Sequence, residues 1–129
     1  AFLRDELERT IEAMGPETVC LVHMEPVQNS GGAFTPPVGY WQGIRELCDR
    51  YDILLSADEV ITGFGRVGAW FASERYDIRP DIITSAKGLT SGSVWPATSN
   101  CLTNSPRDTR VTAVVPIAGF VVTGRLPAG

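Results

Sequence analysis

Short apolar segments alternate along this chain with longer stretches in which apolar residues recur every three or four positions. The apolar segments, each too short for a buried helix, are residues 19–24, 53–55 and 81–84. The stretches with helical spacing are residues 3–14, 40–51 and 70–76. Mostly apolar strands separated by amphipathic helices indicate a mainly parallel sheet covered on both faces. The pattern therefore predicts an α/β fold, with part of a three-layer sandwich.

Charged residues stand where the predicted strands end. Glu25, Asp58 and Lys87 lie at or just beyond the carboxyl ends of strands, which is where parallel sheets carry their chemistry. Lys87 is the only lysine among 11 basic residues. A lysine amine forms a Schiff base with the aldehyde of pyridoxal phosphate (PLP), whose ring nitrogen stays protonated beside a buried carboxylate. The pattern suggests this site but leaves open a solvated lysine and a structural Asp-Glu pair.

Charge and cysteine spacing exclude several other kinds of protein. With 15 acidic and 11 basic residues the net charge is −4, which argues against nucleic-acid and anionic-membrane partners. No apolar run approaches the roughly 20 residues of a membrane span, and the amino-terminal residues lack a signal-peptide pattern. Cys20, Cys48 and Cys101 form no CxxC pair. We therefore predict a cytoplasmic protein with neither a disulfide framework nor a metal site.

The composition changes near Ser93. Residues 1–92 hold 14 acidic and 8 basic side chains, whereas residues 93–129 hold one acidic and three basic side chains and four prolines. We interpret residues 1–92 as the ordered domain and residues 93–129 as an atypical tail. A frameshift, an unrelated end, a disordered segment and a natural linker are the explanations that this composition leaves open.

Several separated blocks closely resemble the cofactor signature of the class III PLP-dependent aminotransferases. They are LLSADEVITGFGRVG at residues 54–68 and DIITSAKGLTSG at residues 81–92, with Asp58 and Lys87 29 positions apart. The upstream segment EPVQ, the following glycine pair and a Pro-Pro pair resemble the stretch that precedes the signature. Members of this family are several hundred residues long. The resemblance thus implies an incomplete part of the large, PLP-binding domain of a fold type I enzyme over residues 1–92.

The resemblance also implies roles for individual residues. Lys87 matches the lysine that bonds PLP and then moves a proton between the substrate and the cofactor. Asp58 matches the carboxylate that pairs with the pyridinium nitrogen, and Val60 matches the aliphatic residue that packs on the ring. Glu25 matches an acid near the cofactor. The phosphate-binding segment, the second stacking residue and the carboxylate-binding arginine are expected outside this chain.

The same resemblance implies a transaminase that moves an amino group from an amine or omega-amino acid to a 2-oxo acid. Ile61 and Ser30 stand where ornithine-type members carry Gln and Glu, which weakens any assignment to ornithine or GABA. The family implies a homodimer, so we expect the 129-residue chain alone to be inactive and prone to aggregation. A non-catalytic remnant, an aminomutase, a racemase and a decarboxylase are the alternatives.

Two further patterns have simpler interpretations. Residues 63–68 fit the dinucleotide fingerprint G-x-G-x-x-G, but acidic residues separate these glycines from the preceding strand, which is the wrong context. His23, the only histidine, lies inside an apolar segment, and we predict that it is a packed core residue rather than a base or a ligand.

Overall fold

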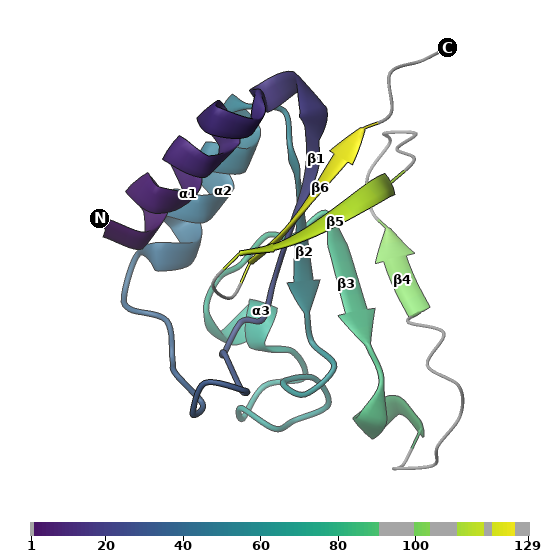
Figure 1. Cartoon of the computed structure of the whole chain (residues 1–129). Coiled ribbons are helices and arrows are strands. Elements are labelled where there is room, and N and C mark those ends of the chain that lie inside the picture. The colour runs from purple at the N-terminus through teal and green to yellow at the C-terminus, as the bar shows by residue number, and fades with distance from the viewer. Residues whose placement is uncertain (1, 91–99, 104–110, 118–119, 126–129) are drawn as a thin grey trace.

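Three parallel strands form the centre of a six-stranded sheet (Figure 1). The computed structural model describes residues 2–90, 100–103, 111–117 and 120–125. The strands are β1 (Val19–Met24), β2 (Leu54–Asp58), β3 (Ile82–Ser85), β4 (Asn100–Thr103), β5 (Val111–Ile117) and β6 (Phe120–Arg125). The helices are α1 (Phe2–Met14), α2 (Tyr40–Arg50) and α3 (Ala72–Arg75), with 3-10 helices at Pro16–Thr18 and Lys87–Thr90. The predicted α/β fold is confirmed.

The strand order is β4-β3-β2-β1-β6-β5. Strand β2 pairs in parallel with both β1 and β3, as the apolar segments predict. Strands β4 and β6 pair antiparallel with β3 and β1, and β5 pairs antiparallel with β6. The strands beyond residue 99 thus add antiparallel edges to a parallel centre. The composition change near Ser93 lies outside the described residues, and a division of the chain there stays a prediction.

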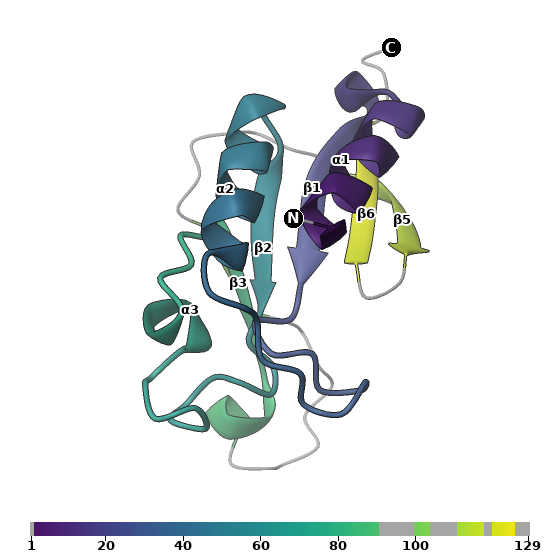
Figure 2. The same ribbon diagram turned by 90° about the vertical axis from the view of Figure 1, so that its left-hand side faces the viewer.

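Helices α1 and α2 lie side by side over one face of the sheet (Figure 2). Their buried apolar side chains pack against strand residues such as Val22 and Leu55, which are neighbours across β1 and β2. The predicted stripe of α1 is buried at Leu7 and Ile11, but Leu3 in its first turn is 45% exposed. The sheet and this helical layer are two of the three layers that the sequence predicts.

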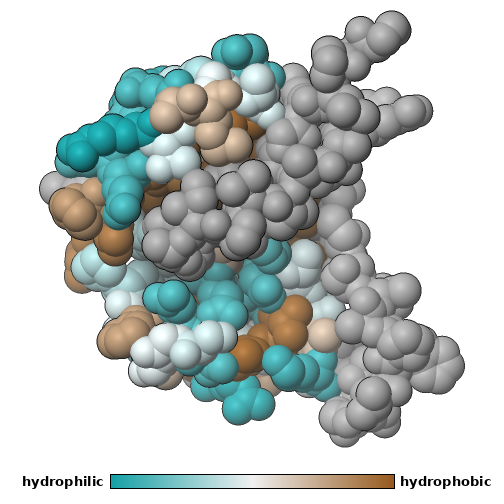
Figure 3. Space-filling view, in the orientation of Figure 1, coloured by the Kyte–Doolittle hydropathy of each residue, from teal (hydrophilic) through white to brown (hydrophobic). Residues whose placement is uncertain are grey.

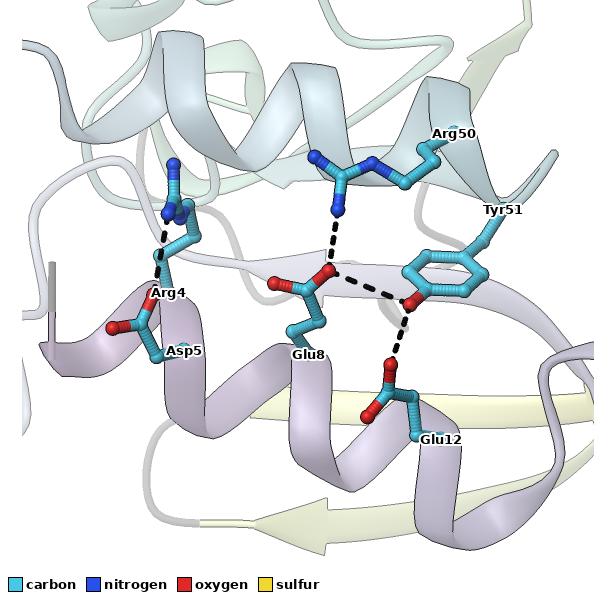
Figure 4. Close-up of polar contacts among 6 residues, drawn as sticks. All are labelled: Arg4, Asp5, Glu8, Glu12, Arg50 and Tyr51. Atoms are coloured by element: carbon cyan, nitrogen blue, oxygen red, sulfur yellow. Dashed lines mark hydrogen bonds and ion pairs between the residues drawn. The ribbon is translucent and has the colours of Figure 1, made fainter.

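Polar contacts at the solvent side join α1 to the end of α2 (Figure 4). Arg50 donates to Glu8, and the Tyr51 hydroxyl donates to Glu12 across 3.0 Å. Exposed ion pairs of this kind contribute about 0–1 kcal/mol each. The two helices are therefore held mainly by their apolar contact with the sheet.

Arg45 connects α2 to the start of β3. Its guanidinium is buried and donates to Asp81 Oδ2 across 2.8 Å and to the Arg79 carbonyl across 3.1 Å. The same Asp81 oxygen accepts a hydrogen bond from the Leu55 backbone N–H across 2.8 Å. Asp81 thus fixes where β3 begins relative to β2, and in consequence where the residues that follow β3 are placed.

On the face shown in Figure 3, apolar patches lie among hydrophilic residues of the described part of the chain. Among the residues whose burial the structure describes, the exposed large apolar side chains are Phe2, Leu3, Phe34, Val38 and Trp70. Within the part of the chain that the structure describes, no helix has the length and apolar character of a transmembrane span.

Candidate functional site

Polar side chains gather on the sheet face opposite the two long helices. Successive side chains of a strand point to opposite faces, and Val22 and Leu55 face the helices. His23 on β1 and Ser56 on β2, which are paired across the two strands, therefore face the other way. Asp58 lies on that same face, beside Thr84 of β3. Asp58 is the last residue of β2, at the carboxyl end of that strand.

Asp58 is held by partners from two directions. Its Oδ2 lies 3.3 Å from His23 Nε2, and its Oδ1 accepts a hydrogen bond from the Val60 backbone N–H across 3.0 Å. The other ring nitrogen of His23, Nδ1, lies 2.9 Å from Ser56 Oγ. The side chains of His23 and Asp58 are each 26% exposed, so the pair is partly accessible at the sheet surface.

These contacts keep Asp58 ionised. Burial raises the pKa of the Asp58 carboxyl, but the hydrogen bonds from His23 and the Val60 N–H lower it by more, so the net pKa lies below the usual aspartate value. The Thr84 hydroxyl also faces the carboxylate and lowers its pKa, although the buried Thr84 Oγ1 makes no well-formed hydrogen bond. A buried hydroxyl in this state can complete its hydrogen bonding with a ligand.

The lowered pKa of Asp58 predicts how stability depends on pH. This pKa is lower in the folded chain than in the unfolded chain. The ionised carboxylate therefore stabilises the fold at pH values above the ordinary aspartate pKa. That contribution is lost as the pH falls through the folded-state pKa. Urea unfolding of the wild type and of Asp58→Asn should therefore differ most near neutral pH and converge in acid. A difference that grows in acid would contradict this prediction.

Lys87 lies at the same edge of the sheet as Asp58. It follows β3 and opens the 3-10 helix Lys87–Thr90, its side chain is exposed, and its φ of 40° is uncommon for a residue with a side chain. Gly88 lies so close to Phe64 that an added Cβ would come within 2.8 Å of the ring. The loop that follows Asp58 therefore packs directly on the segment that carries Lys87.

Glu59 anchors that loop, a role that the sequence pattern did not predict. Its carboxylate is fully buried and accepts hydrogen bonds from the backbone N–H groups of Ala72 and Ser73, and from the hydroxyls of Ser73 and Thr62. These bonds join the end of β2 to the first residues of α3. Asp58 is thus partly exposed at the sheet surface, whereas the buried Glu59 carboxylate holds the loop between β2 and α3 in place.

The glycines of the G-x-G-x-x-G pattern shape this anchored loop. Gly65 and Gly68 have φ values of 87° and 81°, in the left-handed region that favours glycine. An added Cβ at Gly63 would lie 2.8 Å from the Glu59 carbonyl oxygen. Helix α3 starts only at Ala72 and has four residues, so the glycines do not open a helix as a dinucleotide fingerprint does.

Glu25 lies one residue beyond β1, but its carboxylate has a local partner. Its Oε2 accepts a hydrogen bond from the Asn29 backbone N–H across 2.6 Å, which fixes the turn after β1. Glu25 also lines a cavity of about 150 Å³ with the aromatic residues Phe34, Tyr40 and Trp41. Asp58 thus contacts the backbone of Val60, whereas the Glu25 carboxylate is hydrogen-bonded within the turn that follows β1.

A family model described as "Aminotransferase class-III" matches residues 1–110. The chain belongs to the class III aminotransferase family. This confirms the resemblance carried by the signature around Asp58 and Lys87. The match extends beyond residue 92, where the resemblance seen in the sequence stops.

Relatives of this class III aminotransferase chain include proteins of stated activity. It is 56% identical over 88 residues to a protein of Mycobacterium tuberculosis named a probable aminotransferase. It is 51% identical over 88 residues to a hypotaurine/taurine–pyruvate aminotransferase of Paracoccus denitrificans. Each alignment covers 68% of this chain and 19% of the relative. The chain thus spans about a fifth of the length of these relatives.

Solved structures similar to this class III aminotransferase chain include omega-transaminases. An (S)-enantioselective enzyme from Thermomicrobium roseum has a TM-score of 0.69 and 41% identity, covering 97% of this chain and 23% of that one. An enzyme from Pseudomonas jessenii in complex with PMP has a TM-score of 0.67 and 35% identity, covering 96% and 22%. The predicted fold type is therefore confirmed.

His23 corrects one prediction made for this class III aminotransferase chain. Its side chain is partly exposed and contacts Asp58 and Ser56, so the prediction of a packed core histidine is wrong. The apolar neighbours of His23 suggested burial, but strand alternation places it on the other face from Val22 and Met24. Polar residues at alternate positions of the next strand, Ser56 and Asp58, were the signal for a polar face.

Proposed function

We propose that the protein carrying this chain is a PLP-dependent transaminase that moves an amino group from an amine or omega-amino acid to a 2-oxo acid. One observation carries the proposal: the ionised Asp58 carboxylate ends β2, beside the parallel strand that leads to Lys87. A cationic ring nitrogen requires such a carboxylate, and an aldehyde cofactor requires such an amine. Membership of the class III family supports the same reaction.

The residues present fit PLP. Asp58 offers a carboxylate that stays ionised, and Thr84 offers a buried hydroxyl that a ligand can satisfy. Asp58 would pair with the pyridinium nitrogen, and Val60, half-buried beside it, would pack on the ring. Lys87 Nζ would hold the cofactor and then move a proton to and from the substrate carbon. When bound, PLP supplies the electron sink for this proton transfer.

We propose Glu25 as an acid near the cofactor that acts indirectly. Its bond to the Asn29 N–H fixes the turn after β1, at the same end of the sheet as Asp58. A carboxylate that orders a loop beside a ligand contributes to the shape of the site without touching the reacting atoms.

We propose an amine or omega-amino acid as the amino donor and a small 2-oxo acid as the acceptor. The half-buried Ile61 cannot hydrogen-bond to a cofactor oxygen, and Ser30 is neutral where ornithine-type members carry an acid. Both features disfavour ornithine and GABA as donors. The Paracoccus denitrificans relative is named for taurine and pyruvate, which supports this class of donor and acceptor.

We also propose that the complete protein is a cytoplasmic homodimer. The exposed side chains of Phe34, Val38 and Trp70 lie outside the core and would be covered by a second subunit. Light scattering on the polypeptide encoded by the complete reading frame distinguishes a dimer from a monomer.

Covalent capture of PLP tests the proposed function. The polypeptide encoded by the complete reading frame is incubated with PLP, reduced with borohydride, digested and analysed by mass spectrometry. Within residues 1–129 Lys87 is the only lysine, so we expect the reduced cofactor on the peptide that contains it. Pyruvate and a panel of amines then test amino transfer. A folded protein that carries no adduct on Lys87 would favour the non-catalytic remnant.

A further inference from the structure

His23 has one hydrogen-bonding partner on each ring nitrogen. Nε2 lies 3.3 Å from Asp58 Oδ2, and Nδ1 lies 2.9 Å from Ser56 Oγ. Ser56 is 1% exposed, so its hydroxyl is a fixed part of the sheet rather than a mobile surface group. The register places His23 directly opposite Ser56 on the neighbouring strand. The ring is thus oriented by the sheet, with one edge turned to Asp58.

The proton arrangement follows from the chemistry of these groups. An ionised carboxylate only accepts hydrogen bonds, so His23 Nε2 must carry a proton to bond to Asp58. The Ser56 hydroxyl can either donate to Nδ1 or accept from it. This contact is therefore kept whether His23 is neutral or protonated. In both states the Nε2–H group is directed at Asp58.

Both oxygens of Asp58 are engaged from the protein side. Oδ2 faces His23, and Oδ1 accepts from the Val60 N–H, so rotation of the carboxylate about its bond to Cβ is restricted. Among the described residues, the polar groups that face Asp58 come from β1 (His23), β3 (Thr84) and the Val60 backbone. His23 is the one side chain of this set that can place a positive charge next to the carboxylate.

We propose that His23, oriented by Ser56, is a positioning residue that keeps the Asp58 carboxylate ionised and in one orientation toward a cationic ring nitrogen. The inference rests on the proposed function, since Asp58 has this task only in a PLP enzyme. The contact of His23 with Asp58 and Ser56 can nevertheless be tested without cofactor. His23 acts through Asp58 and is not itself in contact with reacting atoms.

Titration of Asp58 in the cofactor-free protein is the first test. The polypeptide encoded by the complete reading frame is labelled with ¹³C at its aspartate carboxyl groups, and the Asp58 signal is assigned by its loss in Asp58→Asn. In His23→Leu, Asp58 should titrate at higher pH than in the wild type. His23→Gln, which can place an N–H donor where Nε2 lies, should restore part of the difference. Tyr51→Phe removes a distant hydrogen bond and should leave the titration unchanged.

Ser56→Ala keeps the imidazole and removes only the group that orients it. It should also move the Asp58 titration to higher pH, and it provides the test even where His23→Leu fails to fold. Circular dichroism establishes folding for each variant. An unchanged Asp58 titration in folded His23→Leu or folded Ser56→Ala would overturn the proposal.

PLP binding is the second test and separates the two proposals. In His23→Leu we expect the dissociation constant for PLP to rise roughly tenfold, the scale of one lost hydrogen bond to a charged group. His23→Gln should lose less than His23→Leu. Wild type that binds no PLP would overturn the proposed function, while the titration still decides whether His23 governs Asp58. Wild-type binding with no loss in folded His23→Leu would overturn the positioning role alone.

Discussion

Replacing Lys87 with arginine should abolish both covalent capture of PLP and amino transfer. Arginine keeps the positive charge, but its guanidinium does not lose its proton in proteins and cannot attack an aldehyde carbon. We expect activity to fall on the order of 10⁶-fold, the scale that follows removal of a covalent nucleophile. After borohydride reduction, mass spectrometry should find no adduct on the peptide that spans residue 87.

A second lysine nearby is the matched control. Arg66 is an exposed residue of the loop that packs against Gly88, and Arg66→Lys adds an amine close to the site without removing Lys87. If PLP reacts only with the amine that the site positions, the Arg66→Lys variant should carry the adduct at Lys87 and not at residue 66. Equal labelling of both lysines would mean that PLP reacts with any accessible amine, and the proposed site would be rejected.

Glu59→Gln should destabilise the fold by about 3 kcal/mol, because buried donors lose a charged acceptor. The carboxylate accepts four hydrogen bonds, from two backbone N–H groups and two hydroxyls. An amide of the same size presents N–H₂ to some of these donors, which leaves them unsatisfied. Urea unfolding measures the change in free energy. Hydrogen exchange should become faster at the amides of Ala72 and Ser73.

Glu74→Gln is the control for that measurement. Glu74 lies on α3 next to Ser73 but is exposed, so the same change of charge should alter stability by less than about 0.5 kcal/mol. Comparable destabilisation by the two variants would show that loss of negative charge, rather than loss of the buried acceptor, is responsible.

The sequence predicted the part of the site that depends on where strands end. Periodicity located the three parallel strands, and the carboxyl ends of parallel strands share one edge. This alternation is enough to predict that Asp58 and Lys87 lie near the same edge of the sheet. The prediction required no contact between particular side chains, only the alternation of strands and helices.

The contacts of His23 and Glu59 could not be predicted from hydrophobic periodicity, because they depend on strand register and on the path of a loop. His23 meets Ser56 only because β1 and β2 pair in one register, and a shift by one residue would turn it toward the helices. Glu59 binds N–H groups 13 and 14 residues away across an irregular loop. Loop paths are set by glycine conformations and close packing, which a single sequence does not specify.

The adjacency of Asp58 and Glu59 has a consequence for how this segment can change during evolution. The Asp58 carboxylate is partly exposed and the Glu59 carboxylate is fully buried, so inserting or deleting a single residue in β2 would exchange their surroundings. Glu59 would lose its buried position and Asp58 its exposed one at the same time, because a shift by one residue turns every side chain of a strand to the other face. A substitution within β2 changes one position, whereas a change in its length displaces Asp58 and Glu59 together. We therefore expect natural variation in this family to include few insertions or deletions between Leu54 and Glu59.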